Sequence, residues 1–199
     1  MLTFKEIVLV KLAAEFMNDL DTRKIIKYSI YKIWSEVIKK VISSLCIPFT
    51  LKKDIFAMVK HILTKVHNWM VDHNRIFTKK QEDSIKFCFK VDGEVDRVKT
   101  ADLLIHSEEL DVQRRFVLAC QYWTSWDVLA FFKNLQESAR EQILHKYSTA
   151  NEDLNLYEKN AVQCGLKTTK KEVSLNLGVG AINIIIGIAF LFRLTFWMI

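Results

Sequence analysis

Three of the five histidines of this chain are regularly spaced, which raises the question of a metal site. His61, His67 and His73 stand six residues apart. On a helix, six residues turn each side chain about 240° from the previous one, so the three imidazoles cannot converge on one ion. We therefore expect partly exposed surface histidines and no bound metal.

The four cysteines, Cys46, Cys88, Cys120 and Cys164, lie far apart and follow no CxxC spacing. They are expected to be reduced, mostly buried thiols of a cytosolic domain. Nothing local pairs any of them with a histidine as a nucleophile, and no Walker, zinc or paired-carboxylate spacing stands out. The sequence therefore predicts neither an enzyme nor a cofactor, and it identifies no small-molecule substrate.

Two further patterns resemble binding motifs. GVGAIN, residues 178–183, is similar to part of a dinucleotide-binding glycine loop, but it lacks the third glycine and a preceding strand. Lysines recur along residues 22–45 beside Tyr28, Tyr31 and Trp34. These lysines could form a nucleic-acid or lipid-headgroup face, although the solvated side of an amphipathic helix is the commoner reason for them. We expect no nucleic-acid partner. Peripheral contact of these lysines with lipid headgroups remains an alternative if another segment already holds the chain at a membrane.

The composition favours helices. Half of the 199 residues are hydrophobic, which is enough for a packed core and excludes disorder as the main state. The chain has 5 glycines and 1 proline, too few for the frequent turns of an all-β fold. The net charge of +6 is modest and by itself identifies no partner.

Three long helices are predicted before residue 76. Thr3 with Glu6 is a capping-box pair that opens the first helix, which can run to about Met17. The second begins near Asp21 and ends before Pro48. Its expected buried face comprises Ile26, Ile30, Ile33, Val37 and Val41. The third begins near Leu51, and its expected buried face comprises Ile55, Met58, Ile62, Val66 and Trp69.

Residues 76–92 follow a different pattern. Ile85, Phe87, Phe89 and Val91 alternate with polar residues or cysteine, as in a strand, and Asp92-Gly93 is a turn signal. A lone strand is unstable, and no second convincing strand is present to pair with it. The segment is therefore expected to be an extended connector or a short irregular helix.

Helices return after residue 94. A short helix around Val98 is followed by one that Asp111 caps and that runs through Tyr122. One long helix is expected from Thr124, and its expected core-facing residues are Val128, Phe132, Leu135, Ala139 and Ile143. A last amphipathic helix is expected to end at Gly165, before a basic linker over residues 166–172. The predicted fold class is thus all-α: stacked helical hairpins, solenoid- or bundle-like, in one domain over 1–165, with a C-terminal hydrophobic helix.

The stretch RRFVLACQYWTSWDVLAFF, residues 114–132, resembles the helix–loop–helix half of an ankyrin repeat. LAC corresponds to the small-residue first helix and WDVLAFF to the second, whereas the TPLH opening, the loop glycine and a second copy are missing. The wider stretch VKTADLLIHSEELDVQRRFVLACQYW is similar to a group of uncharacterised helical proteins of arthropods that share an RF-LAC-YW signature. That group implies a helical fold and no known activity.

Residues 173–199 are a candidate transmembrane segment. The run from Val173 to Phe192 would span about 30 Å as a helix, which matches the hydrocarbon core of a bilayer. Its apolar side chains together outweigh one arginine on an insertion scale, and Arg193 would lie at the far interface, where it can snorkel. The residues expected to meet the membrane are Leu177, Val179, Ile182, Ile184, Ile185, Ile186, Ile188, Phe190, Leu191, Phe192, Arg193 and Trp197.

The lysines before this segment predict its orientation. Lys167, Lys170 and Lys171 would stay on the cytosolic side by the positive-inside rule. The sequence therefore predicts a single-pass membrane protein with a cytosolic N-terminal domain that contacts a protein partner and is not an enzyme. The alternative is a soluble ankyrin-like or helical-repeat fragment whose apolar last helix packs on its core or on a partner.

Overall fold

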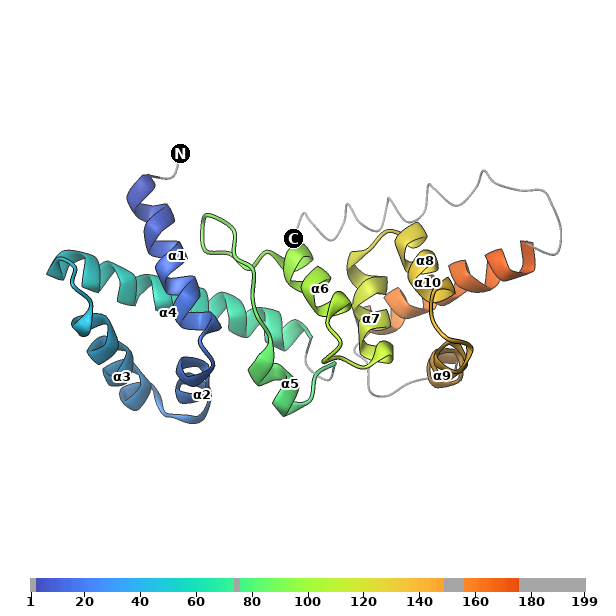
Figure 1. Cartoon of the computed structure of the whole chain (residues 1–199), viewed down its shortest axis with the longest axis horizontal. Coiled ribbons are helices and arrows are strands. Elements are labelled where there is room, and N and C mark those ends of the chain that lie inside the picture. Colours follow the sequence, from blue (N-terminus) through green and yellow to red (C-terminus); the bar gives the residue numbers. More distant parts are fainter. Residues whose placement is uncertain (1–2, 74–75, 149–155, 176–199) are drawn as a thin grey trace. The chain divides into compact units, whose positions relative to one another are not determined.

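The computed structural model describes residues 3–73, 76–148 and 156–175, and these residues form ten helices and no strand (Figure 1). The prediction of an all-α chain is confirmed. The chain divides into two compact units, Met1–Leu104 and Ile105–Ile199, where the sequence led us to expect one helical domain over residues 1–165.

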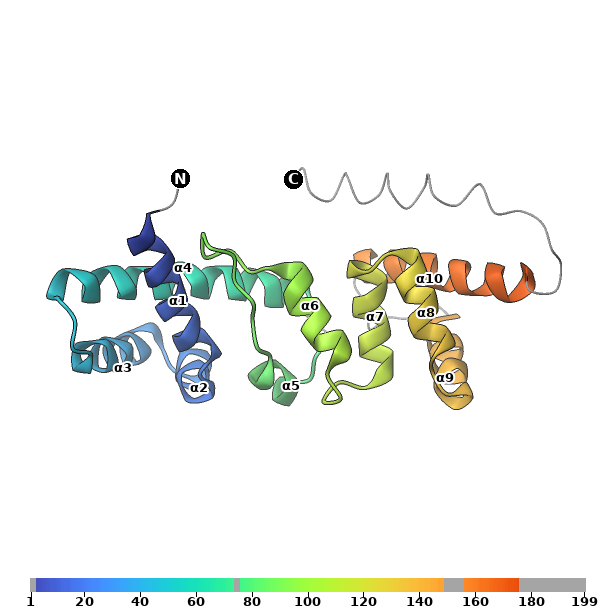
Figure 2. The same ribbon diagram turned by 45° about the horizontal axis from the view of Figure 1, so that its top comes forward.

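Four helices come first in the N-terminal unit: α1 (Phe4–Asn18), α2 (Leu20–Tyr28), α3 (Tyr31–Ser44) and α4 (Phe49–Asp72). α1 crosses α4, and α3 packs along another part of α4 (Figures 1 and 2). Thr3 and Glu6 form the predicted capping box at the start of α1. The Asp19 carboxylate accepts a hydrogen bond from the Thr22 amide at 2.8 Å and so caps α2.

The hydrophobic face of α4 largely matches the prediction. Ile55, Ile62, Val66 and Trp69 are buried, together with Val59. Met58 lies at the edge of this face and is only partly buried. The core of the unit lies where this face meets Leu9, Val10, Ala13 and Met17 of α1.

The prediction for the second helix is wrong in two respects. The helix is interrupted at Ser29–Ile30, so that α2 and α3 are separate. The side chains that face the core from α3 are Trp34, Ser35, Ile38 and Ile42. Of the predicted stripe, Ile30, Ile33 and Val41 face outward and are 68%, 54% and 42% exposed, while Ile26 and Val37 are half-buried. α3 carries two apolar stripes, and the one with the tryptophan is buried because it offers the larger apolar area to α4.

Residues 76–96 contain both of the structures that the sequence left open. A short helix, α5 (Lys79–Ser84), begins with a capping box between Thr78 and Gln81. An extended segment follows it, and a single bridge joins Phe89 to Val95 around a tight turn. Gly93 has φ 86°, a conformation that glycine adopts readily.

Side chains from three helices hold this extended segment in place. The Asn18 amide donates to the carbonyl of Phe87 at 2.9 Å and accepts from the Phe87 amide at 2.8 Å. The Arg23 guanidinium donates to the carbonyls of Glu82 and Ile85, and the Thr100 hydroxyl accepts from the Cys88 amide at 3.0 Å. These bonds replace the sheet partner that the segment lacks. We call Asn18, Arg23 and Thr100 the side-chain clasp.

The second unit is built from α7 (Val112–Tyr122), α8 (Ser125–Lys133), α9 (Glu137–Ser148) and α10 (Leu156–Leu175), while α6 (Arg97–His106) contains the boundary between the units. Asp111 caps α7 as predicted. α7 packs against α8, α9 and α10, and this accounts for the burial of four successive residues, Phe116, Val117, Leu118 and Ala119. The predicted long helix from Thr124 is instead two helices, α8 and α9, because the chain turns at Asn134, the C-cap of α8.

The prediction that the last amphipathic helix ends at Gly165 is also wrong. α10 continues to Leu175 and includes the residues expected to form a basic linker. Gly165 is buried in the middle of α10, where a Cβ atom would lie 2.5 Å from Cys120 Sγ and 3.5 Å from Val128 Cγ1. The glycine is therefore needed for the close approach of α10 to α7, and not for a helix terminus.

This approach gives a testable prediction. Gly165→Ala should destabilise the second unit by about 1–2 kcal/mol, because the steric cost of overpacking exceeds the gain in helix propensity. In a Cys120→Ala background the same change should be neutral or stabilising, since the sulfur is gone. Hydrogen exchange of the α10 amides measures both effects, and equal effects of Gly165→Ala in the two backgrounds would contradict this account.

Candidate interaction surface

The three spaced histidines occupy two kinds of site on α4 and its end. His61 and His67 are exposed, as expected. His73 is buried, which corrects the prediction of a surface residue: its ring stacks on Trp69 at 4.1 Å and its Nδ1 lies 2.7 Å from the Trp69 carbonyl oxygen. Among the residues that the structure describes, no group of three histidine, cysteine or acidic side chains could hold a metal ion.

The cysteines are all free, but the expectation that they are mostly buried is wrong. Cys46 and Cys164 are exposed, and Cys88 and Cys120 are partly exposed. Burial of its sulfur, and to a smaller degree the neighbouring Cys164, raise the pKa of the Cys120 thiol. Burial likewise raises the pKa of Cys88. A thiol with a raised pKa forms little thiolate and is a poor nucleophile at neutral pH.

The predicted membrane and topology residues fall mostly beyond the described chain. Lys167 is exposed on α10, and Lys170 and Lys171 belong to the last turns of the same helix. The predicted membrane residues from Leu177 to Trp197, and the GVGAIN motif, lie outside the described residues. Within the described ranges, no helix has both the length and the apolar character that crossing a bilayer requires.

The aromatic residues predicted beside the lysines of residues 22–45 divide between three places. Tyr28 belongs to α2, where its hydroxyl lies 3.2 Å from Asp83. Trp34 is buried in the α3–α4 contact, with its ring 6.5 Å from that of Phe56. Tyr31 is 56% exposed and meets Trp34 edge-on at 5.1 Å. Tyr28 is also exposed, at 63%, so two of the three rings lie at the surface, but only Tyr31 borders the α3–α4 contact.

Tyr31 belongs to a surface on which lysines lie over aromatic rings. Lys60 Nζ is 5.5 Å from the centre of the Tyr31 ring and 5.4 Å from that of Phe56. Lys39 approaches the same Phe56 ring at 5.5 Å, and Lys53 lies 4.8 Å from the ring of Phe49. We call this set the basic–aromatic face of α3 and α4: Tyr31, Lys39, Phe49, Lys53, Phe56 and Lys60.

The α4 half of this face was missed in the sequence, although a signal for it exists. Phe49 with Lys53, and Phe56 with Lys60, are pairs at i and i+4, the spacing that brings two side chains together on one side of a helix. The contact of Lys60 with Tyr31 links residues of different helices. It depends on how α3 packs on α4, which spacing alone does not reveal.

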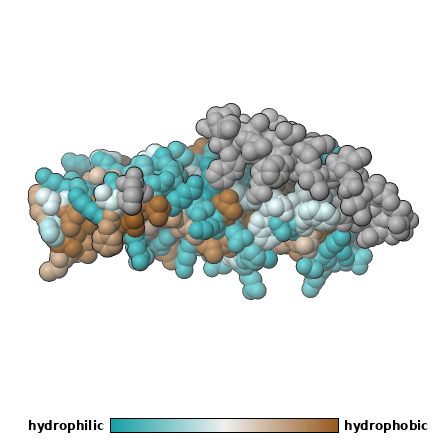
Figure 3. Space-filling view, turned by 90° about the horizontal axis from the view of Figure 1, so that it is seen from above, coloured by the Kyte–Doolittle hydropathy of each residue, from teal (hydrophilic) through white to brown (hydrophobic). Residues whose placement is uncertain are grey.

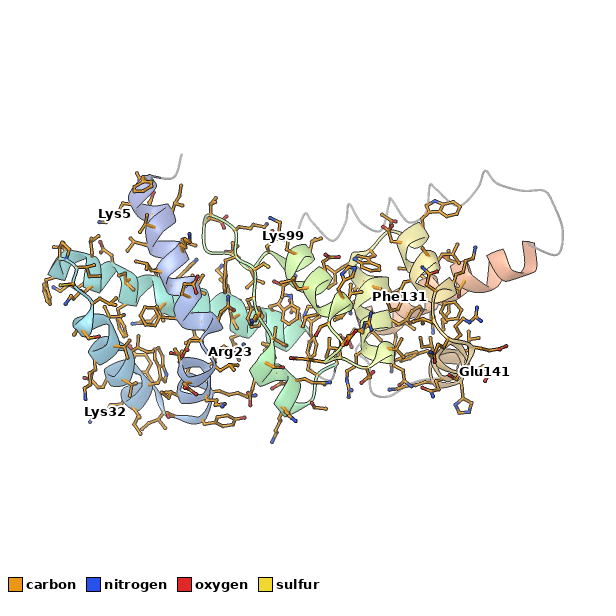
Figure 4. The ribbon with its side chains drawn as sticks, viewed as in Figure 1. Lys5, Arg23, Lys32, Lys99, Phe131 and Glu141 are labelled. Atoms are coloured by element: carbon orange, nitrogen blue, oxygen red, sulfur yellow. The ribbon has the colours of Figure 1, made fainter. Side chains whose placement is uncertain are left out.

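The positive charge of the chain is concentrated in the part of the sequence that runs from α2 into α4. The segment from Thr22 to Val66 contains ten lysines and arginines but only two acidic residues, Glu36 and Asp54. It carries +8, residues 1–21 carry −2, and the residues after Val66 sum to zero, which together give the net +6. Glu36 pairs with Lys39 at 2.8 Å, and Asp54 pairs with Lys5 of α1 at 2.7 Å. Figure 4 shows Lys32 of α3 pointing away from α4.

The outward stripe of α3, comprising the exposed Ile30, Ile33 and Val41 and the half-buried Val37, is a second distinct surface on this unit. Apolar residues of α1 are also exposed, among them Phe4, which is 82% exposed. Hydrophobic residues are visible among hydrophilic ones over this unit, at the left of Figure 3. A helix with apolar residues on both sides has buried only one of them against its own fold.

Comparisons with known protein families, curated protein sequences and solved structures find no match to this chain. Its function must therefore be argued from the surfaces described above and from the sequence.

Proposed function

We propose that the chain is a non-enzymatic, membrane-anchored helical domain that faces the cytosol and binds another protein. The observation that carries the anchor is the run Val173–Phe192, which at 1.5 Å per residue is long enough for the hydrocarbon core of a bilayer. Each Leu, Ile, Phe or Val in such a run favours insertion by roughly 0.3–0.6 kcal/mol. The run is interrupted by few polar residues, chiefly Asn176 and Asn183.

The orientation follows from the lysines that precede the run. Lys167, Lys170 and Lys171 lie on α10 and would remain on the cytosolic side. The two helical units would then be cytosolic, in agreement with four free cysteines. The outward stripe of α3 supports the protein-binding part of the proposal, because an apolar helix face of this kind is a common docking surface for an amphipathic helix.

A second candidate is a soluble helical-repeat fragment whose last helix packs on the stack. The observation that favours it is the packing of α10 against both helices of the α7–α8 hairpin, directly before the hydrophobic run. A helix that continued along such a stack would be buried by protein instead of lipid.

Alkaline extraction of membranes separates the two candidates. We expect the full chain to stay in the membrane pellet, and Ile185→Arg with Ile188→Arg to move it into the supernatant. Two central arginines oppose insertion by about 5–7 kcal/mol, roughly a ten-thousandfold change or more. The matched control, Ile185→Leu with Ile188→Leu, should remain in the pellet.

Truncation after Leu175 is the companion experiment, because it removes the run and leaves α10 whole. A soluble, helical product supports a dispensable anchor. Release of the wild-type chain at alkaline pH, or aggregation of the truncated chain, would favour the soluble repeat with a packed last helix.

A further inference from the structure

We infer that the basic–aromatic face of α3 and α4 lies against the anionic leaflet of the membrane. This inference goes beyond the anchor, but it relies on the proposed anchor to bring the unit close to the bilayer. The ligand is therefore a lipid surface that carries phosphatidylserine-like headgroups.

Charge complementarity is the first argument. α3 and α4 carry seven lysines and three acidic residues, so these two helices account for +4 of the chain's net +6. The three acidic residues are all in ion pairs: Glu36 with Lys39 of the face itself, Asp54 with Lys5 of α1, and Asp72 with Arg97. The cytoplasmic leaflet is negatively charged, and each lysine that approaches it contributes about a fivefold gain in binding.

The chemistry of the side chains is the second argument. Tyr31 and Phe49 are 56% and 71% exposed, and each has a lysine ammonium within 5.5 Å of its ring centre. Aromatic rings prefer the interfacial zone of a bilayer, and lysine stems extend along apolar surface while the ammonium groups reach the headgroups. An exposed ring beside an exposed ammonium therefore fits the boundary between the headgroups and the acyl chains.

The absence of arginine argues against a nucleic-acid partner. All cationic side chains of α3 and α4 are lysines. Arginine provides the bidentate contacts with phosphate and guanine that nucleic-acid interfaces favour, whereas a diffuse anionic surface requires only point charges. The contact also need not be strong, because an anchored unit meets the bilayer at high effective concentration.

Lysine footprinting of the full-length protein tests the inference. The protein is reconstituted in vesicles of phosphatidylcholine alone and in vesicles that also contain phosphatidylserine. Surface lysines are then acetylated and quantified by mass spectrometry. We expect Lys39, Lys53 and Lys60 to react at least about fivefold more slowly with phosphatidylserine present, and high salt to abolish this protection. Lys86 and Lys99, exposed elsewhere in the unit, should react equally in both vesicles.

Charge-reversal variants sharpen the test. In Lys39→Glu/Lys53→Glu, the remaining lysine of the face, Lys60, should lose its dependence on phosphatidylserine. A control with the same change in net charge, Lys86→Glu/Lys99→Glu, should keep the protection of the face. Circular dichroism confirms that both variants retain their helices.

The outcomes separate this inference from the anchor. Equal reactivity in the two vesicles, with the protein still resistant to alkaline extraction, overturns the inference and leaves the anchor standing. Protection by phosphatidylserine in a protein that alkali releases supports the face and overturns the anchor. The inference is also overturned if Lys39, Lys53 and Lys60 are protected equally in vesicles of phosphatidylcholine alone. It is likewise overturned if added RNA protects these lysines and phosphatidylserine has no effect on them.

Discussion

Replacing Trp69 by alanine is expected to lower the free energy of unfolding of the N-terminal unit by about 3–5 kcal/mol. Trp69 is 1% exposed and joins α4 to the chain that follows it. Its ring stacks on His73 at 4.1 Å and on Phe77 at 5.8 Å, and it meets Phe87 edge-on at 5.4 Å. Alanine would remove all of these contacts and leave a cavity that a helix of this length cannot close by a small shift.

Trp69→Phe is the informative control. The indole Nε1 is buried and has no hydrogen-bond partner in the described part of the chain. The phenylalanine variant therefore loses packing area but no hydrogen bond, and we expect its free energy of unfolding to fall by about 1–2 kcal/mol. Hydrogen exchange of the α4 amides in the full-length protein measures both variants. A phenylalanine variant as unstable as the alanine variant would show that the indole N–H matters and that this account is wrong.

Local signals in the sequence predicted the starts of helices well. Thr3 with Glu6 and Asp111 each cap a helix where the sequence placed one. A cap is a hydrogen bond between residues three positions apart, so it can be recognised without knowledge of the rest of the fold. The buried face of α4 was predicted nearly in full, since its residues recur at helical spacing along the whole helix.

The errors arose where the local sequence was compatible with two structures, and tertiary packing determined which of them formed. On α3 the stripe of Ile30, Ile33 and Val41 and the stripe of Trp34, Ile38 and Ile42 both have helical spacing. The stripe with Trp34 is the buried one, because the tryptophan ring gives it the larger apolar area. At Gly165, the same residue type that often ends a helix serves here for the contact with Cys120. The sequence contains no glycine or proline at the breaks near Ser29 and Asn134, so breaker signals could not reveal them.

The candidate surface was only partly predictable for a related reason. Tyr31 was recognised beside the lysines of its own helix, whereas its partner Lys60 comes from the next helix. The exposed stripe of α3 was expected to be core, so its availability to a partner emerged only from the packing. The anchor remains a prediction from hydropathy and length.

The side-chain clasp was the least predictable feature, because the hydrogen bonds of Asn18 and Arg23 join residues 59 to 69 positions apart. Arg23 is central to it. Its guanidinium donates to two backbone carbonyls and lies 5.4 Å from the centre of the Phe87 ring (Figure 4). Burial lowers the pKa of this guanidinium, which nevertheless stays charged at any ordinary pH.

Arg23→Leu is therefore expected to destabilise the N-terminal unit by about 2–4 kcal/mol, because the carbonyls of Glu82 and Ile85 lose a charged donor. Arg23→Lys should recover about half of that loss, since one ammonium cannot reproduce a planar fork that spans two acceptors. Lys24→Leu is the matched control: it removes an exposed charge from the same helix and should cost less than about 0.5 kcal/mol.

The clasp also predicts where the damage appears. The Phe87 and Cys88 amides donate to Asn18 and Thr100, so they should be protected from hydrogen exchange in the wild type. In Arg23→Leu these two amides should exchange faster than the amides in the middle of α4, because the segment detaches before the helices separate. Uniform acceleration across the unit would instead mean that Arg23 stabilises the whole core, and that the extended segment has no independent attachment.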